Sequence, residues 1–425
     1  MSLGNDSRST RIGFGLVLVA TIVLAGCGGG SSSSSPPPTA PVRNTTSAVV
    51  DIGPANNSTN MLFVTVTVCM PGSTTNCQSI DNIQVDTGSE GLRILSSALG
   101  NLDPSSGNGL PTVKDSSNNI LQECVQFADT SYAWGPVAAA DVSMAEENGS
   151  SVPIQVISAT PAFSVPSSCL RLGTGGPSLN TVTALGANGI IGLGVFPDDC
   201  GGACGPTSSN VPNQYYVCPS GACSVAQVAE TSQVANPVVY FPSDNNGVLV
   251  TMPSIDAAGA ATATGSLTFG IGTQSDNALG SASVFTVDDY GEFTSTYNGV
   301  QYPAILDAGS NALYFLDYVT LGIPDCGGSY GGWYCPSSTQ NYTVTNLGTN
   351  GTTGQASFSI ANTLSLFSNS TFTAFNNLGG DSGTGVSTDM VDLGMPFFYG
   401  RSVFVGIMGQ TAPSNAANTY GYFAY

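Results

Sequence analysis

Apolar and polar residues alternate along much of the chain after residue 60. Residues 61–70, "MLFVTVTVCM", place Thr between apolar residues, which is typical of a strand with one buried face. Further short apolar runs follow at residues 152–157, 236–242, 247–252 and 265–272. Few segments have helical period, and residues 85–100 and 311–322 are the two candidates for a short helix. The pattern therefore predicts an all-β fold with few short helices.

The beginning of the chain has a different pattern. Arg8 and Arg11 precede the apolar run "IGFGLVLVATIVLAG", which ends just before Cys27. A positive start, a short apolar core and small residues are typical of a signal peptide, and "LAGC" resembles the lipobox of bacterial lipoproteins. We therefore expect a lipoprotein signal peptide over residues 1–27, lipid on the thiol of Cys27, and an extracytoplasmic chain anchored at the outer membrane or cell surface. The alternatives are an ordinary signal peptide and a transmembrane anchor, for which the run is short.

The next segment contains little that could be buried. Residues 28–42, "GGGSSSSSPPPTAPV", are small, polar or proline, which predicts a flexible tether that stiffens at the prolines. We extend this tether over residues 28–59. The remaining length is enough for one large domain or two of ordinary size. We divide it, on the repeat described below, into an N-terminal lobe over residues 60–255 and a C-terminal lobe over residues 256–425.

The charge balance and the absence of histidine exclude several functions. The 425 residues include 7 Lys plus Arg against 27 Asp plus Glu, for a net charge of −20, so nucleic acid is a poor partner. At acidic pH the carboxylates protonate and their mutual repulsion falls, which favours tolerance of acid. With no histidine, Ser-His-Asp and Cys-His catalysis and histidine metal sites are excluded. Proton transfer must use a carboxylate, Tyr, Lys or Cys.

Eleven cysteines less Cys27 leave an even number for pairing. An exported chain meets an oxidising environment, so we expect disulfides. Plausible pairs are Cys69 with Cys77, Cys326 with Cys335 and Cys124 with Cys169. The cluster of Cys200, Cys204, Cys218 and Cys223 fits disulfides or, alternatively, a zinc site.

One motif occurs twice. Residues 82–95, "NIQVDTGSEGLRIL", and residues 301–316, "QYPAILDAGSNALYFL", each place an aspartate at the end of an apolar run. With Asp307 aligned on Asp86, five of thirteen positions are identical: the Asp, the Gly, the Ser and two Leu. An apolar stretch with glycine follows each motif, at residues 188–196 and 391–407. The same order of features in two halves suggests a duplicated lobe.

These residues resemble the pepsin-like aspartic peptidases, which have two β-rich lobes that each contribute one aspartate. The resemblance covers most of residues 60–425. It implies a two-lobed pepsin-like fold, a monomer, a peptide or protein substrate in a cleft between the lobes, and no cofactor or metal. By the same resemblance Asp86 and Asp307 are the catalytic residues, and six neighbours support them: Thr87, Gly88, Ser89, Ala308, Gly309 and Ser310.

The chemistry explains these residue types. Two carboxyls a few Å apart share one proton, so that one can activate water while the other polarises a carbonyl. Gly88 and Gly309 allow the tight turn. Ser89 and Ser310 can donate hydrogen bonds to the carboxylates, and Thr87 would brace one loop against the other lobe.

The sequence departs from the peptidase pattern at three places. Ala308 lacks the hydroxyl expected beside the second aspartate, and Asp392 puts a charge where an apolar residue is expected. The third place is the hairpin that closes over the substrate, which matches residues 124–142; Phe127, Tyr132 and Trp134 are the candidates for its tyrosine, or they only pack the hairpin on the lobe.

Two other groups of charges have more ordinary interpretations. Arg93 pairs with a carboxylate near the site or serves local structure, and Glu146 and Glu147 are expected in a solvated turn.

Three functions fit this sequence. The first is an aspartic-type endopeptidase that favours acid. The second is a catalytically silent surface lipoprotein that binds a peptide or glycan on the same scaffold, suggested by Ala308 and the altered hairpin. The third is a structural surface protein.

Overall fold

The computed structural model describes residues 43–170, 176–382, 390–410 and 420–425. Residues 41–425 form one compact unit. The predicted signal peptide, Cys27 and most of the predicted tether lie outside the described residues. Within the described ranges, no helix is both long enough and apolar enough to span a membrane.

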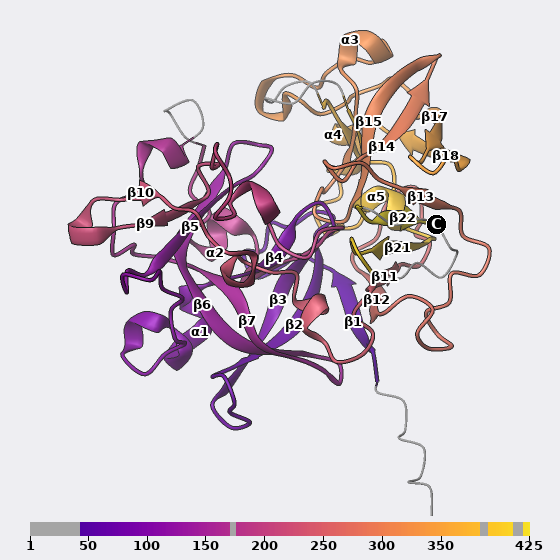
Figure 1. Cartoon of the computed structure of the whole chain (residues 1–425). Coiled ribbons are helices and arrows are strands. Elements are labelled where there is room, and N and C mark those ends of the chain that lie inside the picture. The colour runs from indigo at the N-terminus through magenta and orange to yellow at the C-terminus, as the bar shows by residue number, and fades with distance from the viewer. Residues whose placement is uncertain (1–42, 171–175, 383–389, 411–419) are drawn as a thin grey trace, which may run out of the picture. The chain divides into compact units, whose positions relative to one another are not determined.

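The described strands form two sheets (Figure 1). In spatial order the first sheet contains β10 (Ser224–Val225), β9 (Tyr215–Val217), β5 (Leu121–Gln126), β6 (Tyr132–Met144), β7 (Glu147–Ile157), β4 (Glu90–Leu95), β8 (Gly189–Leu193), β3 (Cys77–Asp86), β2 (Leu62–Cys69), β1 (Thr45–Val50), β12 (Ala263–Phe269), β11 (Gly247–Thr251), β21 (Ser402–Gly406), β22 (Tyr422–Ala424) and β13 (Val284–Thr286). The second contains β18 (Thr353–Ile360), β17 (Gln340–Leu347), β14 (Phe293–Tyr297), β15 (Val300–Asp307), β20 (Val391–Gly394), β16 (Leu313–Phe315) and β19 (Gly379–Gly380). The α-helices are single turns: α1 (Ser96–Leu99), α2 (Val182–Leu185), α3 (Tyr318–Leu321), α4 (Thr363–Leu366) and α5 (Met395–Phe398).

The predicted all-β fold with few short helices is confirmed. Strand β2 alternates as its sequence predicts, because Thr65 is exposed while its apolar neighbours Val64 and Val66 are buried. Both helix candidates begin as strands, β4 and β16, and end in the single turns α1 and α3. Residues 236–242 were expected as a strand and are not one. Asn236 caps a 3-10 turn there by accepting from the amide of Val238, and a proline follows the cap.

The two aspartate motifs have the same strand topology. Strand β3 ends at Asp86 and runs parallel to β8, where Asp86 is opposite Gly192; β4 then pairs antiparallel with β8. Strand β15 ends at Asp307 and runs parallel to β20, where Asp307 is opposite Gly394; β16 then pairs antiparallel with β20. We call β3, β4 and β8 the first repeat, and β15, β16 and β20 the second repeat. The glycine stretches therefore lie beside the aspartates, as the repeated order of features suggests.

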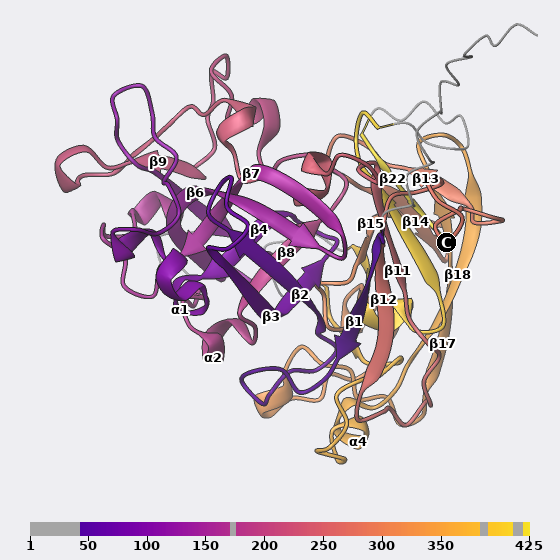
Figure 2. The same cartoon turned by 90° about the horizontal axis from the view of Figure 1, so that it is seen from below.

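The tether predicted for residues 28–59 is wrong over residues 45–50. These residues form β1, which pairs with β12 over six positions, from Thr45 opposite Thr268 to Val50 opposite Ala263, and with β2 at its end. Figure 2 shows β1 between β2 and β12. The sheet thus continues from the first repeat into strands that follow residue 260, across the lobe boundary predicted at residue 255.

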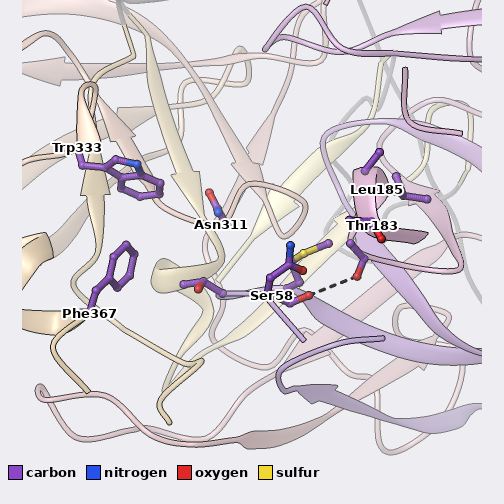
Figure 3. Close-up of a pocket in the computed structure, with 11 residues that line it drawn as sticks. Ser58, Thr183, Leu185, Asn311, Trp333 and Phe367 are labelled. Atoms are coloured by element: carbon purple, nitrogen blue, oxygen red, sulfur yellow. Dashed lines mark hydrogen bonds between the residues drawn. The ribbon is translucent and has the colours of Figure 1, made fainter. Parts of the chain in front are cut away.

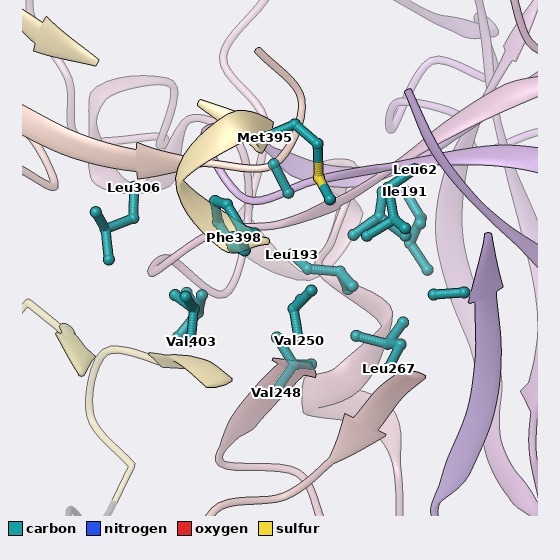
Figure 4. Close-up of a cluster of buried hydrophobic side chains, with 14 of the residues drawn as sticks. Leu62, Ile191, Leu193, Val248, Val250, Leu267, Leu306, Met395, Phe398 and Val403 are labelled. Atoms are coloured by element: carbon teal, nitrogen blue, oxygen red, sulfur yellow. The ribbon is translucent and has the colours of Figure 1, made fainter. Parts of the chain in front are cut away.

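A continuous apolar core connects the strands of both sheets. Figure 4 shows part of it, in which Leu62 and Ile191 lie in the same cluster as Leu306 and Phe398. All four side chains are fully buried. The strand ends that carry the two aspartates are therefore held on one packed interior.

Ten cysteines form five disulfides: Cys69–Cys77, Cys124–Cys169, Cys200–Cys204, Cys218–Cys223 and Cys326–Cys335. The zinc alternative for the four clustered cysteines is wrong, because all four are in disulfides. Five disulfides indicate an oxidising, extracytoplasmic location.

Candidate active site

The structure brings Asp86 and Asp307 together. A β-carbon placed on Gly88 would lie 2.6 Å from Cγ of Asp307, and one placed on Gly309 would lie 2.6 Å from Cγ of Asp86. Each carboxyl therefore rests against the motif glycine of the other repeat. Any side chain at either glycine would occupy the space of the opposite carboxyl, so the approach depends on both glycines.

Equivalent donors hold the two carboxyls. The amide of Gly88 donates to Asp86 Oδ1 at 2.9 Å, and Ser89 Oγ donates to Asp86 Oδ2 at 2.5 Å. In the second repeat the amide of Gly309 donates to Asp307 Oδ1 at 2.7 Å. Ser310 Oγ lies 2.7 Å from Asp307 Oδ2. The glycine and serine of each motif, four of the six predicted supporting residues, thus hold the two carboxyls with the same geometry on both sides.

One threonine links the two motif loops. Thr87 Oγ1 donates to the carbonyl of Leu306 at 2.8 Å and accepts from the amide of Ala308 at 2.8 Å. The Ala308 side chain is fully buried and offers no hydroxyl for a matching link. Gln84 Nε2 adds a bond from the first repeat to the carbonyl of Gly309 at 3.0 Å. The loops are therefore joined from one side, by residues of the first repeat.

The surroundings of the pair favour a proton on it. Burial raises the pKa of Asp307 well above its usual range, and the charge of Asp86, the charge of Asp392 and a hydrogen bond with Asp86 raise it further. A hydrogen bond between two carboxyls requires one of them to be protonated. The geometry therefore fits one acid and one carboxylate side by side.

Two more carboxyls lie near the pair, and sequence reasoning gave neither a role. Burial raises the pKa of Asp392 to about 7, and its Oδ2 is 2.6 Å from Ser310 Oγ. Burial also raises the pKa of Glu90 to about 8, with the charge of Asp86 among the causes, and Glu90 Oε1 accepts from the amide of Phe196 at 3.2 Å. In the sequence, the charge within the apolar stretch at residue 392 was the one feature that could have pointed to Asp392. No comparable feature pointed to Glu90.

The hairpin of β5 and β6 turns at residues 127–131. Asp129 in this turn is one of the charges that, after burial and the charge of Asp392, raise the pKa of Tyr314 on β16. Trp134 is buried and stacks edge-on against Tyr216, which makes it a packing residue.

The two other hairpin candidates, Phe127 and Tyr132, are more accessible. Both are half-buried, and each packs against a different apolar cluster. They remain candidates for the closing role.

A cavity of about 330 Å³ lies next to the second motif. In Figure 3 Trp333 and Phe367 face Thr183 and Leu185, and Asn311 lies between them. Asn60 fixes this position because its Nδ2 donates to the carbonyl of Asn311 at 2.9 Å. Neither Asp86 nor Asp307 lines the cavity. Its lining is connected to the pair by Asn311, the residue that follows Ser310.

A second hollow, of about 560 Å³, lies elsewhere, between Arg401, Phe404 and Tyr425. The described ranges contain no group of three Cys, Asp or Glu residues that could hold a metal ion.

Arg93 serves local structure. Its Nη2 lies 2.7 Å from Glu123 Oε1 and 2.6 Å from Asp199 Oδ2, and all three side chains are buried. Its Nη1 also donates to the carbonyl of Glu90 at 2.5 Å. Arg93 therefore links the backbone at Glu90, four residues after Asp86, to the buried carboxylates of Glu123 and Asp199.

The prediction for Glu147 is wrong. It was expected in a solvated turn, but it is fully buried and accepts a hydrogen bond from Ser243.

No curated protein matches the sequence. Among solved structures, an aspartic proteinase from Irpex lacteus aligns with 89% of this chain and 96% of its own, at 13% sequence identity and a TM-score of 0.49. The family model described as "Protein of unknown function (DUF3443)" matches residues 40–425, and the chain therefore belongs to that family.

Proposed function

We propose that the protein is an aspartic-type endopeptidase that cuts a peptide bond at acidic pH. The observation that carries this proposal is the contact of two carboxyls, each against the other repeat's glycine, with the pKa of Asp307 raised. The ionised member takes a proton from a water molecule, which attacks the peptide carbonyl, while the protonated member polarises the carbonyl oxygen. The hairpin turn at residues 127–131 would exclude water from the site when substrate is bound.

The cavity beside Asn311 supports a peptide as the substrate. The rings of Trp333 and Phe367 offer an apolar surface for a substrate side chain, and Asn311 in the same lining directly follows Ser310, the partner of Asp307. The same surface favours the second candidate, a protein that binds a peptide or glycan without cutting it. That candidate predicts ligand capture by wild type with no product, even at acidic pH.

The test is cleavage of a denatured protein between about pH 3 and 5, where pairs with one shared proton operate. Asp86→Asn and Asp307→Asn should each lower turnover by at least about 10³-fold, because each removes one proton-transfer group. Asp81→Asn, in the same strand as Asp86 but exposed, is the matched control and should cut like wild type. Unchanged cleavage in either site variant rules the proposal out, and a pepstatin-type inhibitor that binds wild type at low pH separates both candidates from a purely structural protein.

We also propose that the chain is anchored by lipid on Cys27. The support is the run of apolar residues that ends in "LAGC". A radiolabelled fatty acid supplied to expressing cells should label wild type and leave Cys27→Ser unlabelled. Equal labelling of both would contradict the anchor.

A further inference from the structure

A third carboxyl belongs to the hydrogen-bond network of the two aspartates. Asp392 lies on β20, between β15, which ends at Asp307, and β16. Its side chain is 7% exposed. Ser310 Oγ lies 2.6 Å from Asp392 Oδ2 and 2.7 Å from Asp307 Oδ2, so a single hydroxyl connects the two carboxyls.

This connection requires a proton on one carboxyl. A serine hydroxyl carries one hydrogen and can donate to only one of two acceptors. The second contact, at hydrogen-bond distance, needs a hydrogen supplied by the carboxyl itself. If Asp307 and Asp392 were both ionised, one carboxylate oxygen would face Ser310 Oγ without a hydrogen between them.

The hydrogen-bond partners favour Asp392 over Asp307 as the holder of that proton, which is additional to the one that Asp307 shares with Asp86. Asp307 accepts from the amide of Gly309 as well as from Ser310, and donors of this kind favour the ionised form. Asp392 Oδ1 is buried and has no hydrogen-bond partner among the described residues. An unpaired buried oxygen costs less on a neutral carboxylic acid than on a carboxylate.

We propose that Asp392 is protonated and donates to Ser310 Oγ, which directs the serine hydrogen to Asp307 and holds that carboxyl in position for the reaction. The inference rests on the proposed function for its effect on catalysis. Asp392 touches neither water nor substrate in this role; it is a positioning residue that acts through Ser310.

The arrangement sets an upper pH limit. Burial raises the pKa of Asp392 to about 7, and the charge of Asp86 adds to this. The groups that face it are Asp307 from β15, Tyr314 from β16 and Asp86 from β3. When Asp392 ionises, it takes the Ser310 hydrogen away from Asp307 and adds a negative charge beside the pair.

The first test compares wild type with Asp392→Asn across pH. The amide of the variant has the same shape, donates to Ser310 at every pH and carries no charge. The two proteins should have kcat/KM values within about twofold of each other at pH 4, and the variant should be about tenfold higher at pH 8, where an acid of pKa 7 is nine-tenths ionised. On the alkaline limb, log kcat/KM should fall with a slope of about two in wild type and about one in the variant, because wild type has one more proton to lose.

Two further variants serve as a replicate and a control for this comparison. Asp392→Leu resembles the apolar Ile190 at the equivalent position of β8, and it should also have a slope of about one. Glu147→Gln removes another buried carboxyl, whose partner is Ser243, and should keep the wild-type slope. A constant ratio of wild type to Asp392→Asn from pH 4 to pH 8 would indicate a merely structural role and would overturn the proposal.

The second test needs no activity. With ¹³C-labelled aspartate carboxyls, wild type should have one NMR resonance that titrates near pH 7 and that is missing from Asp392→Asn. That resonance in a wild-type protein that cuts no peptide would support the proton on Asp392 and contradict the proposed function. If no Asp392 resonance titrates above the ordinary value of about 3.8, the inference fails whatever the activity.

Discussion

Thr87 holds two backbone groups of the opposite motif at once. Its hydroxyl is the partner of the Leu306 carbonyl and of the Ala308 amide, and Thr87 is 1% exposed. Neither group can turn to solvent instead, because the surrounding loops are packed. With Ala308 in place of a hydroxyl residue, the position of the second motif depends on this one side chain more than it would in a symmetric site.

Thr87→Val should therefore lower the free energy of unfolding by about 2–4 kcal/mol, since two buried backbone groups lose their partner. Cleavage should fall with it as the two carboxyls lose their relative position. Denaturant unfolding with a cleavage assay measures both effects. Thr87→Ser keeps the hydroxyl and serves as the control; if it is as damaging as valine, the hydrogen bonds are not the cause.

Gly309→Ala tests the approach of the carboxyls directly. The added carbon would lie 2.5 Å from Asp86 Oδ1, closer than any real contact, so the two motif loops must separate. We expect loss of cleavage and of inhibitor binding at acidic pH. Gly202→Ala, whose added carbon would have no heavy atom nearer than 3.9 Å, should leave both unchanged. Inhibitor binding of normal affinity by Gly309→Ala would contradict the proposed geometry.

At the scale of the element, the local sequence pattern correctly predicted those strands whose form depends on local contacts. The alternation in β2 and the apolar runs that end in Asp86 and Asp307 follow from one buried face and from strand ends. The prediction of a tether over β1 is wrong because the strand form of β1 depends on β12, more than two hundred residues away. The buried position of Glu147 and the contact of Asp392 with Ser310 also arise from pairing and packing between distant segments, which one sequence does not display.

The Cys124–Cys169 disulfide ties the β5–β6 hairpin to a segment 45 residues on, whereas Cys200–Cys204 closes a loop of 4. Loop-closure entropy predicts about 4 kcal/mol of stabilisation for the first and about 2 kcal/mol for the second. Replacing each pair by alanine and measuring denaturant unfolding should reproduce this order. The reverse order would mean that the hairpin is held mainly by its apolar contacts.

For the whole molecule, buried acids make stability depend on pH. A carboxyl with a higher pKa in the folded chain than in the unfolded chain stabilises the fold below its unfolded pKa and loses that contribution as pH rises through the folded value. The pH range over which this contribution is lost runs from 3.8 to about 7 for Asp392 and from 4.5 to about 8 for Glu90. The protein should therefore be more stable at pH 4.5 than at pH 8.

Each of these two groups accounts for no more than about 4 kcal/mol of that difference, and Glu90 for less because solvent reaches it. Denaturant unfolding at pH 4.5, 6 and 8 measures the trend. Glu90→Gln should flatten it, while Glu146→Gln, an exposed neighbour of a buried acid, should not. A wild-type protein that gains stability between pH 4.5 and 8 would contradict the raised values.

The pairing of β1 with β12 limits when this part of the sheet can form during synthesis. Thr45 leaves the ribosome long before Thr268, yet the two end up opposite each other. Such distant pairings form late, after the intervening chain has been made. The same holds for Asp86 and Asp307, so the two carboxyls can meet only after residue 307 has been made, and the proposed peptidase activity would begin no earlier than that.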